Sequence, residues 1–157
     1  MKQKIKFILG YFVTQIETTK HRFWVIYYCF KFCCRIMKNA FLHDLSKYSW
    51  GESKYFAKTI FDLKHSTYGT PEYKEMLDRI SPAIKHHTSI NNHHPEFYKN
   101  NKDIKIIEMI EMICDWKSAT RRHANGNIFK SLEINEKRFN FDGNQMKIFR
   151  EIVEIIN

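Results

Sequence analysis

Glycine and proline are scarce in this chain, and their scarcity limits the folds open to it. The 157 residues include five glycines and three prolines. Tight turns depend on these residues more than on most others, so a fold of many short strands is disfavoured. The length and a hydrophobic content of 43% suit one domain with a substantial core. We therefore predict an all-α fold, with a single helical-bundle domain over residues 1–157.

Several common catalytic motifs are also missing. The chain has no glycine-rich phosphate loop, no G-x-S-x-G nucleophile elbow and no H-E-x-x-H zinc-protease motif. It has no C-x-x-C pair either, and we expect its four cysteines to be buried, reduced thiols because they fall in apolar stretches. Reduced thiols and the lack of a cleavable signal pattern predict a cytoplasmic protein. These cysteines are Cys29, Cys33, Cys34 and Cys114.

Negative charge is in short supply. Lysine and arginine outnumber aspartate and glutamate by 26 to 17, which gives a net charge of +9 and attracts anionic partners. No basic run reaches five residues, so we do not expect a dedicated nucleic-acid face. The longest apolar run, residues 23–30, falls short of the roughly 20 residues that span a membrane, and we expect no membrane association. The sequence is also compatible with a homo-oligomer.

Apolar periodicity divides the chain into helices. The helix near residues 18–37, capped by Thr18 or Thr19, is apolar around nearly its whole circumference, which predicts a central place in the bundle. A loop is expected near 65–71, with Pro71 opening the next helix, and an irregular segment over 90–101. The predicted helices are 1–15, 18–37, 40–49, 52–63, 71–85, 103–123, 128–138 and 144–156.

The adjacent pair His43 and Asp44 is the most informative feature of the sequence. At a helix end, an imidazole and a carboxylate can reach one divalent ion together. Further ligands must come from elsewhere, and His21 upstream and Asp115 downstream are the candidates. Asp115 lies among apolar residues, and a carboxylate in apolar company should be paired or bound to a metal.

Half of the eight histidines crowd into one short segment, IKHHTSINNHHPE. Functional side chains concentrate in irregular segments between rigid helices. Two or three of these histidines could complete a mononuclear or dinuclear metal site, whereas the alternative is a polar surface loop. We favour the metal site because the His-Asp pair supports it independently. The four residues are His86, His87, His93 and His94.

Three charged residues are candidates for catalysis. Lys47, one turn after the His-Asp pair, could neutralise a substrate phosphate, and its alternative is a local ion pair. Glu52 and Glu111 could transfer protons. Glu108, Glu111 and Asp115 share one helical stripe. An ordinary amphipathic helix with its acidic residues in water shows the same pattern. We favour that interpretation for Glu108 and Glu111.

The residues singled out above resemble a known signature. His21, the pair His43 and Asp44, and Asp115 look like the H…HD…D pattern of the HD-domain metal-dependent phosphohydrolases. The string HDLSK is similar to the variant of that pattern in which the lysine meets phosphate. The histidine-rich segment resembles the additional ligands of dinuclear members, with one histidine from each of its two pairs. The resemblance implies an HD-like helical bundle.

A closer resemblance covers nearly the whole chain. The strings HDLSKYSWGE, YGTPEYKEML, NNHHPEFY, EMICDWKSATRRH and SLEINEKRF look like a small family found in bacteria and their viruses. Its members are named only as proteins of unknown function. This resemblance implies a fold and a site but no substrate, and a viral member would act in the host cytoplasm.

The resemblance to HD proteins implies an enzyme with one or two divalent metal ions, which could be Mn, Fe, Zn, Ni, Co or Mg. Its substrate would be a nucleotide or another small anionic phosphoester, hydrolysed by metal-activated water. A first alternative is a di-iron oxygenase, because some dinuclear HD proteins are oxygenases. A second is a non-catalytic protein that binds a nucleotide or a host protein on behalf of a virus.

Overall fold

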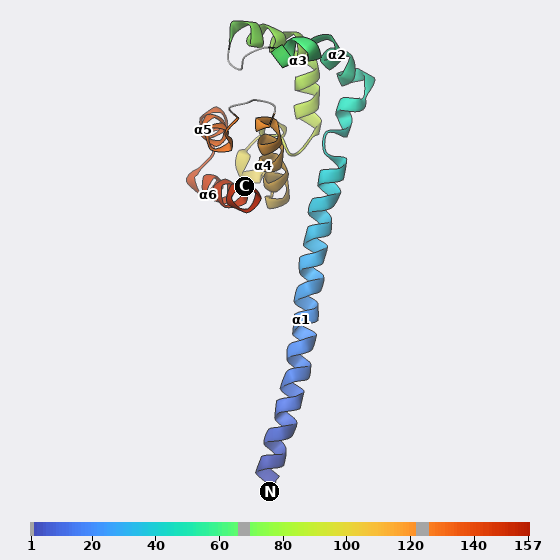
Figure 1. Cartoon of the computed structure of the whole chain (residues 1–157), viewed down its shortest axis with the longest axis vertical. Coiled ribbons are helices and arrows are strands. Elements are labelled where there is room, and N and C mark those ends of the chain that lie inside the picture. Colours follow the sequence, from blue (N-terminus) through green and yellow to red (C-terminus); the bar gives the residue numbers. More distant parts are fainter. Residues whose placement is uncertain (1, 66–69, 122–125) are drawn as a thin grey trace. The chain divides into compact units, whose positions relative to one another are not determined.

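The computed structural model describes residues 2–65, 70–121 and 126–157. Over these residues the chain forms α-helices and short 3-10 helices and no strand, which confirms the all-α class (Figure 1). The elements are α1 (Lys2–Leu42), η1 (Leu45–Tyr48), α2 (Trp50–His65), α3 (Pro71–Ile90), η2 (Pro95–Phe97), η3 (Asn101–Asp103), α4 (Ile106–Thr120), α5 (Ile128–Phe139) and α6 (Gly143–Ile156).

Two compact units make up the chain, Met1–Phe41 and Leu42–Asn157. The first unit contains α1 except for its last residue, Leu42, and the second unit contains the remaining helices. That residues 1–157 act as one domain stays a prediction. No described helix combines the length and the apolar character that crossing a membrane would require.

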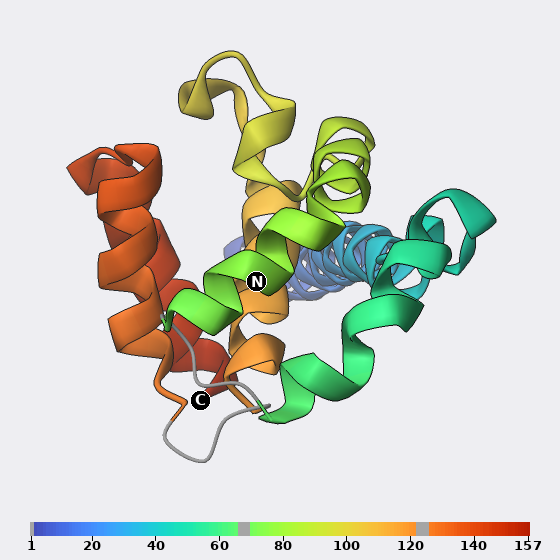
Figure 2. The ribbon, with the colours of Figure 1, turned by 90° about the horizontal axis from the view of Figure 1, so that it is seen from above.

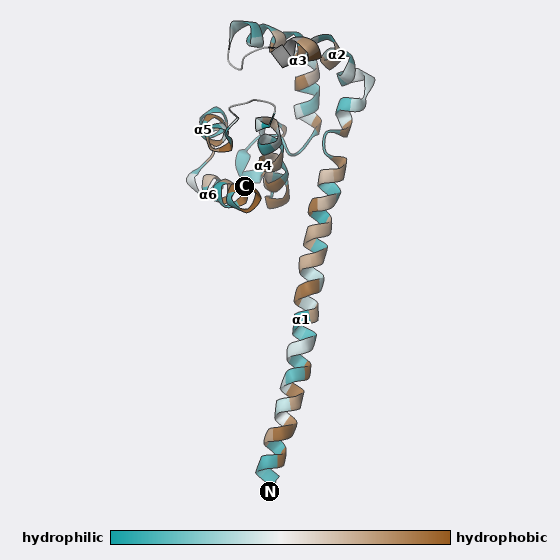
Figure 3. Cartoon of the chain, viewed as in Figure 1, coloured by the Kyte–Doolittle hydropathy of each residue, from teal (hydrophilic) through white to brown (hydrophobic). Residues whose placement is uncertain are grey.

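Helix α1 differs from the sequence-based prediction in two ways. It is one continuous helix of 41 residues, so the predicted break and cap near Thr19 are wrong. The Thr19 hydroxyl instead donates to the carbonyl oxygen of Gln15 at 2.8 Å, a bond within the helix. No described residue of α1 is buried, contrary to the predicted central helix, and apolar residues line its surface along its length (Figure 3).

The cysteines also differ from prediction in part. All four are free, in agreement with the expected reduced state, but all four are exposed. Three of them lie on α1, whose described side chains are all outside the core, so apolar neighbours in sequence did not imply burial. The fourth, Cys114, lies on the outward side of α4.

Several helices of the second unit begin and end close to the predicted positions. Pro71 is the first residue of α3, and the Thr70 hydroxyl caps the helix by accepting from the backbone N–H of Tyr73 at 3.3 Å. Helix α3 continues to Ile90, past the predicted end at 85, so the first pair of histidines is helical. Residues 66–69 of the predicted loop and 122–125 at the predicted end of the next helix lie outside the described residues.

The core of the second unit lies between α4, α5 and α6. These three helices contact one another pairwise, while α2 packs along α3 (Figure 2). Helix α6 begins with a capping box, in which Asp142 accepts from backbone N–H groups and Gln145 reaches back to the backbone of Asp142. The most deeply buried apolar side chains are Met112, Ile113, Leu132, Phe149 and Val153.

Two residues of α6 provide a matched test of this core. Phe149 is fully buried and its ring contacts those of Phe141 and Trp116, whereas Ile155 is 84% exposed. We expect Phe149→Ala to lower the free energy of unfolding by about 3–5 kcal/mol, because it leaves a cavity. Ile155→Ala should change it by about 0.5 kcal/mol or less. Urea denaturation followed by circular dichroism measures both, and equal effects would contradict the described packing.

Candidate metal centre

The His-Asp pair lies at a turn and not within a helix. The sequence predicted a helix over 40–49, but α1 ends at Leu42 and the backbone of Asp44 turns with φ of 58°. This left-handed conformation is uncommon outside glycine, and aspartate tolerates it better than most residues. The short helix η1 follows at once, with the Lys47 N–H donating to the Asp44 carbonyl at 2.9 Å. The turn aims the Asp44 carboxylate away from the helical path.

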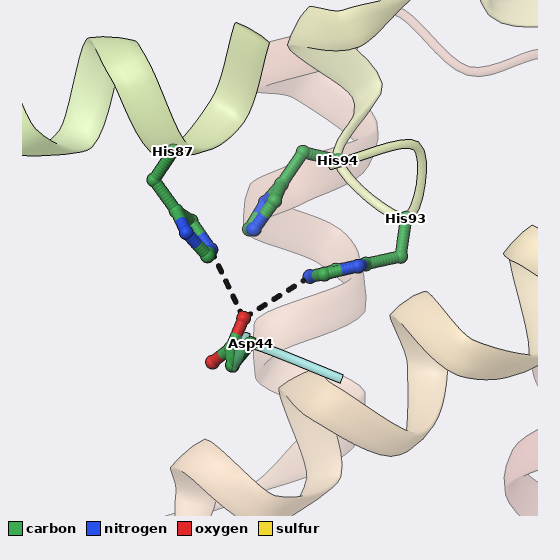
Figure 4. Close-up of side chains that lie close together, drawn as sticks. All are labelled: Asp44, His87, His93 and His94. Carbon is green, nitrogen blue, oxygen red and sulfur yellow. Dashed lines mark ion pairs between the residues drawn. The ribbon is translucent and has the colours of Figure 1, made fainter. Parts of the chain in front are cut away.

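Four side chains converge on one point in the second unit (Figure 4). Asp44 comes from the turn, His87 from the last turn of α3, and His93 and His94 from the segment after α3. One potential ligand atom from each lies within 4.8 Å of the others. Asp44 Oδ1 is 3.0 Å from His87 Nε2 and 3.4 Å from His93 Nε2. We call these four residues the Asp44 group.

The facing atoms of the Asp44 group are buried without hydrogen bonds. Among the residues that the structure describes, five buried side-chain atoms lack a hydrogen-bond partner, and four of them are Asp44 Oδ1 and the Nε2 atoms of His87, His93 and His94. Each such atom costs about 1–3 kcal/mol when it is left unsatisfied. A divalent ion would satisfy all four at once. Three imidazoles and one carboxylate suit a transition metal better than magnesium, so the residues fit such an ion.

A second set of potential ligands adjoins the first. His43, His93 and Asp115 also bring one ligand atom each within 4.8 Å of one another, and we call them the His43 group. His43 Nε2 lies 3.6 Å from Asp115 Oδ1 and 3.4 Å from Asp44 Oδ2. The two carboxylate oxygens of Asp44 therefore face different groups. The structure brings His43, Asp44 and Asp115 together, and their role as metal ligands stays a prediction.

The charge on Asp44 is strongly stabilised. Burial raises the pKa of its carboxyl, but contacts with His43, His87, His93 and Lys47 outweigh burial and hold the pKa well below its usual range. The Lys47 ammonium is 2.5 Å from Asp44 Oδ2, which gives the lysine the local ion pair considered from the sequence. Asp44 is thus an anion at neutral pH and is available as a hard ligand.

Two histidines near the turn have pKa values shifted in opposite directions. The carboxylate of Asp115, and after it that of Asp44, raises the pKa of His43 to about 10. Burial, followed by the positive charge of two neighbouring histidines, lowers the pKa of His94 to about 3. Neutral His94 offers a lone pair at neutral pH, whereas His43 must release a proton before it can bind a metal.

Two glutamates hold the outer nitrogens of these histidines. Glu52 is completely buried, with its carboxylate oxygens 2.7 Å from His86 Nδ1 and 3.1 Å from His87 Nδ1. Glu111 Oε1 lies 3.0 Å from His43 Nδ1 and 3.2 Å from the same atom of His93. Carboxylate contacts at Nδ1 leave Nε2 free to bind a metal. The interpretation of Glu111 as a water-facing acid is therefore wrong, and its role in proton transfer stays a prediction.

Glu108 overturns the same interpretation more clearly. Its side chain faces inward with 4% exposure, and the Asn92 amide donates to Glu108 Oε1 at 3.3 Å. The first turn of α4 packs against the irregular segment that carries Asn92. The Glu108 carboxylate therefore contacts protein and not water. Spacing within a helix identified the stripe but not which side of the helix is buried.

Sequence reasoning missed two polar residues that complete the network. Ser46 Oγ donates to Glu52 at 3.1 Å and lies 2.8 Å from His87 Nδ1, and the Asn91 amide donates to Ser46 at 3.0 Å. Ser46 lies within the string HDLSK and Asn91 within INNHH. Their positions next to the candidate ligands were the one sign in the sequence that they could take part in the site. His86, 56% exposed on its side chain, belongs to neither group of ligands. His21 is exposed on α1, and its role as a ligand stays a prediction.

Comparison with known proteins identifies the family. Residues 12–157 match a family of unknown function, DUF5662, and the chain belongs to this family. No curated protein and no solved structure matches the chain.

Metal uptake by the Asp44 group can be measured directly. We expect zinc, manganese or iron(II) at 100 times its Kd to stabilise the protein by about 2.7 kcal/mol. Asp44→Ala should abolish this gain, because it removes the one oxygen ligand among three histidines. Asp78→Ala, an exposed aspartate on α3, is the matched control and should behave as the wild type. Thermal unfolding with elemental analysis tests both variants, and full metal binding by the Asp44 variant would refute the site.

Proposed function

We propose that this chain is an HD-type metal-dependent phosphohydrolase acting on a nucleotide or another small phosphoester. The observation that carries the proposal is the convergence of four buried ligand atoms without hydrogen bonds in the Asp44 group. The order of His43, Asp44 and Asp115 along the chain and their proximity in the second unit support it further.

The proposed chemistry divides among the residues near the turn. A divalent ion held there supplies a Lewis acid for the phosphoryl oxygens and lowers the pKa of bound water towards neutrality. The Asp44 group would hold one ion, with His43 and Asp115 available for a second. Lys47 keeps its ammonium beside Asp44 while 36% of its side chain remains exposed, so it can meet an incoming phosphate. Glu52 and Glu111 remain the candidates for proton transfer.

The charge of the chain favours an anionic substrate. A net charge of +9 raises the local concentration of phosphorylated molecules. The basic residues form no long run, which suits a small phosphoester better than an extended nucleic acid.

A second candidate function has one observation in its favour. The Asp44 group offers three imidazoles, a donor set that suits iron as well as zinc. A di-iron oxygenase would use the same residues. Iron absorbance that changes when oxygen is admitted to an anaerobic sample would favour the oxygenase, and turnover with zinc or another redox-inert ion would favour the hydrolase.

Phosphate release tests the main proposal. The protein is loaded separately with Mn, Fe, Zn, Ni, Co or Mg and assayed against nucleotides and simple phosphomonoesters and phosphodiesters. We expect Asp44→Ala to be inactive and Lys47→Ala to lose roughly 10²-fold in kcat, because it removes one charge that stabilises the transition state. Lys85→Ala, on α3, is the control and should keep wild-type activity. A fully active Asp44 variant would exclude the mechanism, and tight ligand retention without turnover would favour the binding protein.

The predicted role of His21 needs its own measurement. If it is a ligand, His21→Ala should lower metal content per chain while the helicity of the protein stays unchanged. The control is Gln15→Ala, which changes another exposed residue of α1. Unchanged metal content and affinity in the His21 variant would limit the ligands to the second unit.

A further inference from the structure

We propose that Glu52 and Glu111 are positioning residues of unequal reach, with Glu52 supporting one metal position and Glu111 supporting both. The inference rests on the metal site of the proposed function. It assigns each glutamate a task that differs from proton transfer, namely to fix the tautomer and the direction of the histidines that bind metal.

Glu52 supports only the Asp44 group. It lies in the first turn of α2 and is fully buried, and a buried carboxylate persists only when it is well paired. One oxygen contacts exposed His86, and the other contacts His87 Nδ1 at 3.1 Å. His87 is the one ligand candidate among these contacts, and it belongs to the Asp44 group alone.

The surrounding hydrogen bonds favour one tautomer of His87. The Asn91 amide donates to Ser46 Oγ at 3.0 Å and to the His87 carbonyl at 2.8 Å, and Ser46 in turn donates to Glu52. The Asn91 amide nitrogen also lies 3.1 Å from His87 Nδ1, but Ser46 Oγ and the His87 carbonyl take its two protons. Because Ser46 donates its own proton to Glu52, Ser46 Oγ and Glu52 Oε2 can both accept a proton from His87 Nδ1. A proton on Nδ1 leaves the lone pair on Nε2, the atom that faces Asp44.

Glu111 reaches a histidine of each group. Its Oε1 contacts the Nδ1 atoms of both His43 and His93, whose rings lie 4.4 Å apart between centroids. His93 Nε2 faces Asp44 Oδ1, and His43 Nε2 faces Asp115 and Asp44 Oδ2. A single oxygen on α4 therefore sets the direction of one ligand for each metal position.

Replacing either carboxylate with the isosteric amide separates the two roles. Glutamine keeps the size of the side chain but is a weaker acceptor for two histidine N–H groups. Loss of such a partner costs about 10–100-fold in metal affinity. We expect Glu52→Gln to weaken one of two binding steps by this factor and Glu111→Gln to weaken both. Glu75→Gln, an exposed glutamate on α3 paired with Arg79, should change neither step.

The experiment is a cobalt(II) titration of the full chain, followed by visible absorption and by metal content per chain. Cobalt absorption reports the ligand geometry, so it should change in Glu52→Gln even when excess cobalt restores full occupancy. Circular dichroism of the metal-free variants checks that folding is intact. If Glu52→Gln does not fold, Glu52→Asp, which keeps the charge on a shorter side chain, should bind with an altered spectrum.

Each result separates the inference from the proposed function. A wild-type chain that takes up no cobalt would overturn both. Two-step wild-type binding that Glu52→Gln or Glu111→Gln leaves unchanged would overturn the inference and leave the metal site standing. One bound cobalt per wild-type chain, or equal effects of the two variants on both steps, would also overturn it. Metal binding with the expected pattern but without phosphate release would support the inference and reject the hydrolase.

Discussion

The site depends on the meeting of one carboxylate oxygen, Asp44 Oδ1, with three buried imidazole nitrogens. A folded chain rarely leaves four polar atoms without hydrogen bonds at one point, because each costs free energy that solvation or pairing would recover. The surrounding structure must therefore hold the atoms there. It does so through the outer nitrogens, which Glu52 holds at His87 and Glu111 holds at His93. The hydrogen bonds of Glu52 and Glu111 therefore help to hold the Asp44 group in place.

Local backbone features deliver these side chains. Asp44 has a left-handed backbone conformation, which ends the helical path and turns its carboxylate away from it. Surrounding contacts must support this conformation. The extension of α3 to Ile90 places His87 on a rigid helix, and the next segment returns His93 towards it. Helix α4 supplies Glu111 and is itself fixed through the α4, α5 and α6 core. Core packing and site geometry are thus coupled through one helix.

The sequence was a good guide where local chemistry decides structure. Pro71 marked the start of α3, and the histidine-rich segment and the His-Asp pair marked residues that lie close together, because these signals act over a few residues. It was a poor guide where distant contacts decide. Periodicity could not show that α1 is continuous and without buried residues, or that Glu108 faces inward. Burial depends on which surfaces meet, and a single helix does not carry that information.

The donor atoms also limit how two ions could be held together. His93 appears in both ligand groups, but its Nδ1 faces Glu111, so one lone pair on Nε2 is left for one ion. That nitrogen suits the Asp44 group better, since His93 Nε2 faces Asp44 Oδ1 at 3.4 Å and both atoms are buried without a hydrogen bond. A second ion would then rely on His43, Asp115 and the other oxygen of Asp44. Lys47 already contacts that oxygen, so a second ion would compete with the lysine for it, and a displaced ammonium would be free to meet a phosphate.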